Sequence, residues 1–301
     1  MINKLKRAFT QPTYLLAGLL NRTARLWSDK AFLKLKFWLT MKKRLNLKDP
    51  KTFNEKLQWL KLYDKKNEYT VMVDKIEVKE YVASIIGDKY IIPTLGVYHT
   101  YDEIDFEKLP NQFVLKCSHD SGGVVICKDK SSFDKRKAKE ILEQGLKQNF
   151  FYQNREWPYK NVIPRLLAEQ YITDVGSEIY DYKVHNFNGV PKFILVCKNR
   201  FKGGKVINDF YTDKWEFMDI RRPGNPNSPT PQTPPVELEK LLELSKMLSK
   251  NIPFLRTDFY IANGKIYFGE LTFYPASGMV RFEPEHWDNI FGDWIKIGEN
   301  N

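Results

Sequence analysis

Alternating apolar and polar residues near the C-terminus predict two β-strands joined by a tight turn. β-Branched and aromatic residues alternate with polar ones over 254–273, and Asn263-Gly264 interrupts them midway. An Asn-Gly pair between two such runs is typical of a β-hairpin. Because successive side chains of a strand point to opposite faces, this hairpin displays two different faces.

The length of the turn decides which residues of this hairpin share a face. A two-residue turn separates Asp258 from Glu270 on opposite faces. A three-residue turn, with Gly264 in the left-handed conformation, places Arg256 opposite Glu270 and Asp258 diagonally on the same face. We expect the three-residue turn, since it also gathers apolar residues on the other face, namely Leu255, Phe259, Ile261, Tyr267, Leu271 and Phe273.

Similar patterns upstream predict an α+β protein. Residues 1–47 are expected to be helical, and Thr52 and Glu55 form a capping box that opens a second helix. The segment 222–235 is rich in proline and is expected to be a long irregular loop or lid. Further helices are expected at 71–86, 135–149 and 236–250, and strands at 90–92, 112–117, 124–127, 166–172, 181–187 and 192–196.

Positive charge is concentrated at the N-terminus. The chain of 301 residues has a formal net charge of +11, and residues 1–50 hold 12 Lys or Arg against two Asp or Glu. Over 31–44 the basic residues alternate with Leu, Phe and Trp. Residues 1–44 are therefore expected either to lie on an anionic membrane surface or to pack as a helix with a solvated face.

Composition narrows the class of protein further. Nucleic acid is not expected as a partner, because no recognition motif accompanies the charge. No apolar run reaches the roughly 20 residues that span a bilayer. The three cysteines lack metal-ligand spacing and indicate a reducing compartment. We expect a cytoplasmic protein that can touch the inner face of the plasma membrane.

The polar face of the C-terminal hairpin carries chemistry that suits a divalent cation. Two carboxylates held close together, Asp258 and Glu270, repel each other unless a cation lies between them. Hard oxygen ligands of this kind suit Mg²⁺, which completes its coordination with water and substrate phosphates. The alternative is a purely structural hairpin in which Arg256 pairs with both acids.

A second candidate site is the glycine-rich loop 118–123 between two predicted strands. Backbone N–H groups of such a loop can approach phosphate oxygens closely, and Lys116 supplies a positive charge at its base. The alternative is an ordinary hairpin turn, because Gly-Gly pairs are also common there.

Six motifs, in this order, resemble the TupA-like ATP-grasp proteins of bacterial surface-polysaccharide gene clusters. The resemblance covers roughly residues 20–290. The stretches that carry it are PKTFNEKLQWLKLYD, DKIEVKEYV, FVLKCSHDSGGVVI, REWPYKNVIPRLLAEQYI, DYKVHNFNGVPKFI and RTDFYIANGKIYFGELTFYP.

This resemblance implies the ATP-grasp fold, in which two α+β subdomains clamp ATP, here with a basic helical N-terminal extension. It implies transfer of the γ-phosphoryl group of ATP to a carboxylate, followed by attack of an amine on the acyl-phosphate. The implied parts are the basic arm at 1–50, a region with the first phosphate lysine at 51–110, a small subdomain with the flap and adenine hinge at 111–172, and a large subdomain with the metal-binding hairpin at 173–301.

The resemblance also implies which residues bind ATP. Lys75 and Lys116 match the two phosphate-contacting lysines, and Glu178 is assigned to the ribose. The flap residues are Ser118, His119, Ser121, Gly122 and Gly123, and the hinge that hydrogen-bonds adenine comprises Glu169, Gln170 and Ile172. For His119 the alternative is a hydrogen-bonded loop histidine.

Asp258 and Glu270 match the Mg²⁺ ligands of the family, and Arg256 matches the residue that steadies the acyl-phosphate. Lys183 is assigned to phosphate or substrate. Thr272 stands where many members of the superfamily have asparagine. Its hydroxyl is a weak neutral donor for Mg²⁺, so whether one or two ions bind stays open.

Three functions follow as hypotheses. The first is an ATP-dependent ligase that joins a carboxylate, such as a uronic acid of a cell-surface glycan, to an amine. The second is a glycosyltransferase of the same polysaccharide pathway, although an Asp-x-Asp motif is absent. The third is a non-catalytic membrane adaptor, which the retained lysines and carboxylates argue against. The acceptor depends on loops such as 150–164 and 222–235, whose structure the pattern does not predict.

Overall fold

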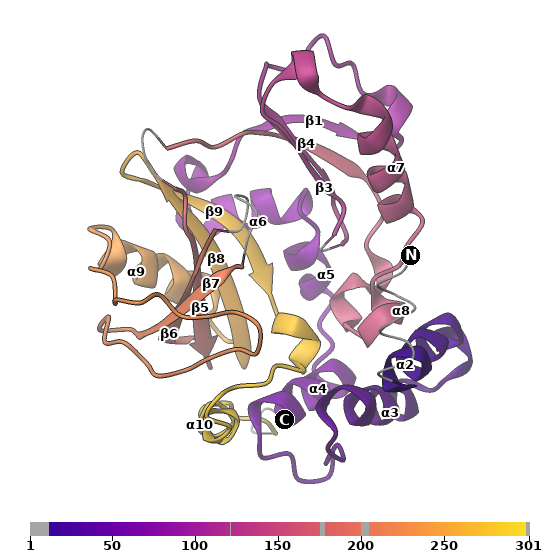
Figure 1. Cartoon of the computed structure of the whole chain (residues 1–301), viewed down its shortest axis with the longest axis vertical. Helices are drawn as coiled ribbons and strands as arrows, with labels where there is room; N and C mark the ends of the chain where they lie inside the picture. The colour runs from indigo at the N-terminus through magenta and orange to yellow at the C-terminus, as the bar shows by residue number, and fades with distance from the viewer. Residues whose placement is uncertain (1–11, 121, 175–177, 200–204, 299–301) are drawn as a thin grey trace.

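Two separate antiparallel β-sheets, one at the top and one at the left of Figure 1, pack with helices on either side. This computed structural model describes residues 12–120, 122–174, 178–199 and 205–298. The helical elements are α2 (Pro12–Arg22), η1 (Ala24–Leu26), α3 (Asp29–Met41), α4 (Phe53–Tyr63), α5 (Glu68–Val73), α6 (Glu77–Ile86), η2 (Asp88–Tyr90), η3 (Tyr101–Glu103), η4 (Lys130–Ser132), α7 (Lys135–Leu146), α8 (Phe151–Asn154), η5 (Trp157–Asn161), α9 (Leu238–Leu248), η6 (Pro275–Gly278) and α10 (His286–Trp294). The strands are β1 (Thr94–Tyr98), β2 (Phe113–Cys117), β3 (Val124–Cys127), β4 (Leu166–Gln170), β5 (Asp181–Phe187), β6 (Val190–Lys198), β7 (Ile207–Thr212), β8 (Phe254–Ala262) and β9 (Lys265–Thr272).

The smaller sheet, at the top of Figure 1, has the strand order β1-β4-β2-β3. Helix α7 covers one of its faces, where Leu142 joins the core around Leu115 and Ala168. Lys116 follows Leu115 and Glu169 follows Ala168. Because successive side chains of a strand alternate between faces, Lys116 and Glu169 point to the opposite face of the sheet. Strand β1 lies in the region predicted as 51–110 and pairs with β4 of the region predicted as 111–172, while the four-part division itself stays a prediction.

The larger sheet has the strand order β7-β6-β5-β8-β9. Helix α9 packs on one face, where Ser245 Oγ donates to Asn186 Oδ1 at 2.8 Å. The opposite face carries Lys183 directly across from Asp258. The predicted hairpin that begins at 181 is confirmed as β5 and β6. Its placement beside β8 brings the polar residues of two distant segments onto one face.

Helix α4 attaches the N-terminal part of the chain to the larger sheet. The predicted capping box is confirmed, since Thr52 accepts from the Glu55 N–H and Glu55 accepts from the Thr52 N–H. Phe53 is buried at the start of this helix. Its ring contacts the rings of Phe187, Phe254, Phe282 and Phe291 at centroid distances of 5.0–6.1 Å. The aromatic cluster around Phe53 therefore joins α4, β5, β8 and α10 in one core.

The N-terminal helices α2 and α3 pack at the edge of the molecule beside α4 and α8 (Figure 1). Helix α3 begins after Ser28, whose side chain accepts from the Ala31 N–H. Five of its apolar residues are buried, namely Phe32, Leu33, Phe37, Leu39 and Met41, whereas Trp38 is exposed. Within the described ranges, every helix is too short or too polar to cross a lipid bilayer.

The three-residue turn that we expected in the C-terminal hairpin is wrong. Ala262 pairs with Lys265, so the turn consists of Asn263 and Gly264 alone. Both have positive φ, 50° and 69°, as a type I′ turn requires, and this turn matches the right-handed twist of the strands.

A β-bulge restores the shared polar face that a two-residue turn would otherwise destroy. The ladder shifts by one residue between Asp258 and Phe259, which places Asp258 opposite Glu270 and Arg256 opposite Thr272. Gly269 lies at this bulge, where a Cβ atom would approach the Tyr260 ring to 3.0 Å and the carbonyl oxygen of Asp258 to 3.1 Å, so glycine is the residue that fits most easily. The expected pairing of Arg256 with Glu270 across the strands is therefore replaced, although all four side chains share one face.

The shift also changes which residues of β9 lie on the apolar side. Phe268 is opposite Phe259 and Ile266 is opposite Ile261, and both Phe268 and Ile266 are buried. Tyr267, which we expected there, lies on the other face.

Two further expectations upstream are wrong. The predicted helix over 71–86 is two helices, because Asp74 adopts an extended conformation between α5 and α6. The predicted strand at 90–92 is not formed, since η2 ends at Tyr90 and β1 begins at Thr94. The break at Asp74 turns the following residue, Lys75, toward the space between the sheets.

Candidate active site

The hairpin β8–β9 holds an arginine between two acids. Arg256 Nε and Nη2 donate to the two oxygens of Asp258 at 2.6 and 2.7 Å. Nη2 also lies 2.9 Å from Glu270 Oε1 and 3.0 Å from Thr272 Oγ1. Burial alone would lower the pKa of Arg256, but the charges of Asp258 and Glu270 outweigh burial and raise it. The four side chains therefore form one hydrogen-bonded group with Arg256 between the two acids.

Strand β5 adds a lysine to this group. Lys183 Nζ lies 2.6 Å from Asp181 Oδ2 and also contacts Asp258. Burial would lower the pKa of Lys183, but Asp181 and then Asp258 outweigh burial and raise it. Lys183 is buried, lines neither of the two cavities described below, and pairs with Asp181 and Asp258 beside the hairpin; its assignment to phosphate or substrate stays a prediction.

The hairpin carries carboxylates of the kind that Mg²⁺ takes, but in the structure Arg256 pairs with both acids, as the structural alternative predicted, and the metal assignment stays a prediction. Among the described residues no group of three or more His, Cys, Asp or Glu is placed to hold a metal ion. Mg²⁺, however, is usually held by one or two carboxylates together with substrate phosphates and water. Asp258 and Glu270 supply that pair from directly opposed positions, with the Thr272 hydroxyl beside them. Glu270 is the more accessible, since 39% of its side chain is exposed against 1% for Asp258.

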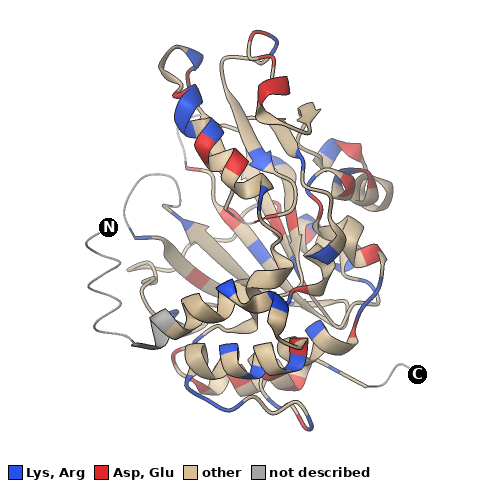
Figure 2. Ribbon diagram, turned by 90° about the vertical axis from the view of Figure 1, so that its right-hand side faces the viewer, with Lys and Arg blue, Asp and Glu red and all other residues tan. Residues whose placement is uncertain are grey.

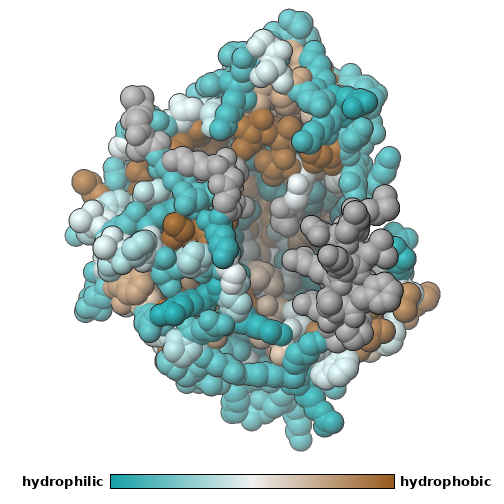
Figure 3. Space-filling view, viewed as in Figure 1, coloured by the Kyte–Doolittle hydropathy of each residue, from teal (hydrophilic) through white to brown (hydrophobic). Residues whose placement is uncertain are grey.

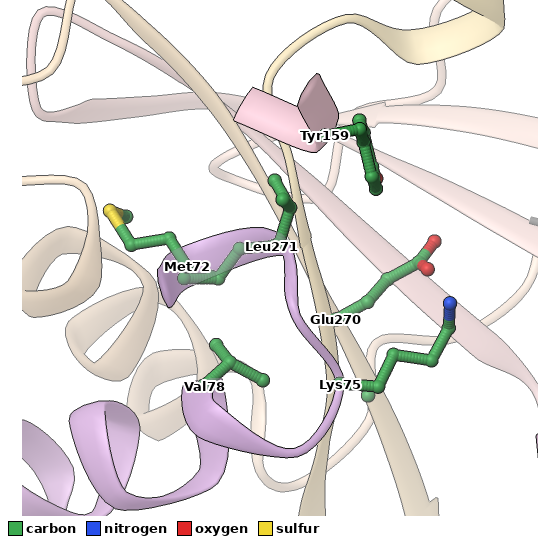
Figure 4. Close-up of a pocket in the computed structure, with 8 residues that line it drawn as sticks. Met72, Lys75, Val78, Tyr159, Glu270 and Leu271 are labelled. Atoms are coloured by element: carbon green, nitrogen blue, oxygen red, sulfur yellow. The ribbon is translucent and has the colours of Figure 1, made fainter. Parts of the chain in front are cut away.

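Lys75 and Glu270 line a cavity next to the hairpin. Figure 4 shows the ammonium of Lys75, the carboxylate of Glu270 and the hydroxyl end of Tyr159 pointing into the same space. Met72, Val78 and Leu271 close its apolar side. Burial lowers the pKa of Lys75, although Glu270 and Asp120 act in the opposite direction. The cavity therefore combines a cation and an anion in a poorly solvated place.

A neighbouring cavity contains the second predicted lysine. It lies between the smaller sheet and β9, and its lining includes Lys75, Lys79, Lys116, Glu169, Ile92 and Phe268. Lys75 lines both cavities, so the two lie next to each other at this residue. Figure 3 shows the surface hollowed between the two sheets, with hydrophobic residues along the upper edge of the hollow.

The glycine-rich loop packs against Lys75. The Lys75 N–H donates to the Ser118 carbonyl at 3.0 Å, and Lys75 Nζ contacts the Asp120 carbonyl. Gly123 N–H donates to the Asp120 carboxylate at 3.0 Å. Gly122 is exposed, whereas Ser121 lies outside the described residues. The loop is thus close to the lysine, as a phosphate-covering flap requires, and its role in binding stays a prediction.

The side chains of Ser118 and His119 hold the loop from inside. Ser118 Oγ donates to the Ile163 carbonyl at 3.3 Å and accepts from the Arg165 N–H. His119 Nε2 lies 2.9 Å from the Gln148 carbonyl. Both side chains are buried, and the Ser118 N–H donates to the Arg165 carbonyl at 2.8 Å; a role of these two residues at the phosphates stays a prediction. The side chain of His119 is thus that of a hydrogen-bonded loop histidine, which was the alternative to a role in phosphate binding.

The hinge residues are at the end of β4. The carboxylate of Glu169 is buried and contacts Lys79 at 2.7 Å and also Lys116. Gln170 N–H donates to the Pro93 carbonyl at 3.0 Å. Ile172 is half-buried, beyond the end of the strand. Their roles at adenine stay predictions.

Glu178, which we assigned to the ribose, contacts a different segment. Its Oε1 accepts from the Asn199 N–H at 2.5 Å, and it is not among the residues that line either cavity. The structure therefore does not place Glu178 with the two lysines, and the ribose assignment remains untested.

Sequence reasoning missed three residues of this site. Lys79 could have been found from the predicted helix over 71–86, in which it follows Lys75 by four residues, although in the structure Lys75 lies before the start of α6. Asp181 precedes Lys183 by two residues on one strand and shares its face. Tyr159 belongs to η5 within an irregular segment, where no periodicity indicates which side chains reach the site.

Comparison with known proteins identifies a family. A family model described as TupA-like ATPgrasp matches residues 55–296. No curated protein matches the chain.

Solved structures of similar fold include D-alanine–D-alanine ligase from Bacillus anthracis complexed with ATP, at 16% identity and a TM-score of 0.39 over 67% of this chain and 53% of that one. They include the corresponding ligase from Helicobacter pylori, at 15% identity and a TM-score of 0.43 over 81% and 69%. A RimK domain protein ATP-grasp from Sphaerobacter thermophilus matches at 12% identity and a TM-score of 0.40, over 75% of this chain and 69% of that one. The chain thus spans about half the length of the first of these.

Proposed function

The chain belongs to the TupA-like ATP-grasp family, and from this premise we propose that it is an ATP- and Mg²⁺-dependent ligase that joins a carboxylate to an amine and forms ADP. The observation that carries the proposal is the meeting of two cavities at Lys75. One cavity has an acid of the hairpin, Glu270, and the other has Lys116 and Glu169 with apolar walls.

This arrangement suits the two ends of ATP. The apolar walls formed by Ile92 and Phe268 fit the flat faces of an adenine ring. Lys75 and Lys116 supply the positive charge that a triphosphate needs between the two cavities. The phosphate end then points to Glu270, where a bound Mg²⁺ would neutralise negative charge on the transferring phosphoryl group.

The remaining residues serve the second substrate. Arg256 and Lys183 place two cations on the face where a carboxylate must approach the γ-phosphate, and both are largely buried. Buried cations act strongly on charge that develops during transfer, because little water screens them. In this proposal Arg256 steadies the acyl-phosphate, and the amine attacks it once water has been excluded.

The nature of the carboxylate is inferred from the resemblance to surface-polysaccharide proteins. We assign it to the class of sugar acids, such as a uronic acid of a glycan or of its precursor, and the amine donor to small amino compounds.

The test of this proposal is a phosphate-release screen with ATP, Mg²⁺ and pools of amino acids and uronic acids. Release of ADP and phosphate only when a carboxylate and an amine are both present is the expected result. Tight binding of a uridine-diphosphate sugar without binding of ATP would instead support glycosyl transfer.

We also propose that residues 16–27 contact an anionic membrane surface. Leu16, Leu19, Leu26 and Trp27 are exposed by 40–84%, and no acidic residue occurs before Asp29. Figure 2 shows basic residues on the helices at the bottom of that view. Most large apolar residues of α3 are packed inside the protein, although Trp38 is 46% exposed, and residues 1–11 lie outside the described residues. The proposal is therefore made for 16–27 alone, within the predicted 1–44.

Vesicle binding tests the membrane contact. Leu19→Glu places a charge on the exposed apolar surface of α2 and is expected to weaken binding to vesicles that contain phosphatidylglycerol by about tenfold. Val236→Glu, at another exposed apolar residue, is the matched control and is expected to change nothing. Equal sedimentation of both variants with the vesicles would contradict the proposal. If Leu19→Glu instead lost self-association in solution, the surface would be assigned to contact with a second copy of the chain.

A further inference from the structure

The cavity between the sheets contains a third lysine, Lys79 on α6, which the proposed mechanism does not use. Its side chain is 14% exposed. Its ammonium nitrogen lies 2.7 Å from Glu169 Oε1, 2.7 Å from the Ile92 carbonyl oxygen and 2.9 Å from Thr94 Oγ1. Because a lysine ammonium has three donors, these contacts use all of them and hold the side chain in one position.

Lys79 and Lys116 hold Glu169 from two sides. Glu169 Oε1 faces Lys79 of α6, and Oε2 contacts Lys116 of β2. Burial alone would raise the pKa of Glu169, but the two ammonium groups outweigh burial and lower it. The carboxylate is therefore charged at neutral pH and only accepts hydrogen bonds. Each of its oxygens has two acceptor positions, so each keeps one for a ligand.

We propose that Lys79 is a positioning residue that orients Glu169 to accept a hydrogen bond from the amino group at position 6 of adenine. The inference rests on the proposed binding of ATP. A purine with an oxygen at position 6 presents an acceptor to the fixed carboxylate, and two acceptors repel each other. Lys79 thus contributes to the choice of ATP over nucleotides with a 6-oxo purine.

A purely structural role of Lys79 predicts something different. Lys79 also joins α6 to Ile92, in the segment before β1, and to Thr94, the first residue of β1. If that were its only role, its loss would weaken every nucleotide equally, because the cavity as a whole would loosen. The ratio between two nucleotides that differ only at position 6 separates the two roles.

Isothermal titration of the full chain with ATP and with inosine triphosphate, in the presence of Mg²⁺, provides the test. In Lys79→Met the affinity for ATP is expected to fall about tenfold, while the affinity for inosine triphosphate changes little. Lys79→Arg keeps a cation beside Glu169 and is expected to restore most of the preference for ATP. Lys246→Met, at an exposed lysine of α9, is the control and is expected to match the wild type.

Two results would overturn the inference. Equal loss of affinity for both nucleotides in Lys79→Met would leave Lys79 a structural residue, and an unchanged preference for ATP would exclude it from nucleotide selection. Thermal unfolding of each variant shows whether it is folded, and Lys79→Arg provides the comparison if Lys79→Met is not. If the wild-type protein bound neither nucleotide, the proposed function would be overturned together with this inference. Equal loss for both nucleotides, or an unchanged preference for ATP, would overturn only the role of Lys79.

Discussion

Replacement of Glu270 by glutamine is expected to lower the rate of ATP turnover by at least about 100-fold. The carboxylate lies opposite Asp258 and points with Lys75 into one cavity (Figure 4). Glutamine keeps the size of the side chain but removes the charge that attracts Mg²⁺. The measurement is phosphate release from ATP in the presence of carboxylate and amine pools.

The matched control is Glu243→Gln on α9, where the glutamate is exposed and pairs with Lys240 at 2.8 Å. Turnover in that variant is expected to equal the wild type. Asp258→Asn removes the other hairpin acid and is expected to act as Glu270→Gln does. If both hairpin variants turned over ATP normally, the assignment of these acids to a metal would be refuted.

Replacement of Phe53 by alanine is expected to lower the free energy of unfolding by about 3–5 kcal/mol. Phe53 is 1% exposed, and its ring lies 5.0 Å from that of Phe254 in an edge-to-face arrangement. The substitution removes these contacts and leaves a cavity that a close-packed core refills only in part. Urea denaturation followed by tryptophan fluorescence gives the value.

Leu26→Ala serves as the control for this measurement, since Leu26 is 84% exposed. Its effect is expected to stay within about 0.5 kcal/mol. A loss below about 1 kcal/mol for Phe53→Ala would contradict a central role of the aromatic cluster around Phe53, because core truncations of this size cost more.

Two structural features that depend only on residues adjacent in the sequence were predicted correctly from the sequence. The capping box at Thr52 and Glu55 and the hairpin of β5 and β6 are confirmed. Each is specified within a few residues, by a side chain that bonds a nearby N–H or by a turn that suits positive φ. The family resemblance, carried by six short stretches, is confirmed for the same reason, since each stretch is local.

The bulge in the C-terminal hairpin was not predictable from the alternation. Pattern reasoning assumes an unbroken ladder from turn to end, so the turn length seemed to decide whether Asp258 and Glu270 share a face. The structure uses a two-residue turn and a bulge instead. The sequence signal was Gly269, a glycine within a strand, which often marks a bulge or a close approach of backbone.

Contacts between residues far apart in the sequence were the other part of the site that could not be predicted from the sequence. Periodicity shows which face of a helix or strand a residue occupies but not which distant element covers it. The pairing of Lys79 with Glu169 joins residues 90 positions apart, and Tyr159 reaches the cavity from an irregular segment. The same limit explains Ser118 and His119, which were expected at the phosphates and whose side chains bond the protein itself.

The aromatic cluster around Phe53 also sets when the apolar side of α4 can be buried during synthesis of the chain on the ribosome. All four ring partners of Phe53 are encoded at least 134 positions downstream, and Phe291 is last. At about 5–20 residues per second, synthesis leaves α4 without Phe291 for on the order of 10–50 s. During this interval a nascent chain presents the apolar side of α4 to chaperones, and a transcript truncated before α10 yields a protein that never covers it.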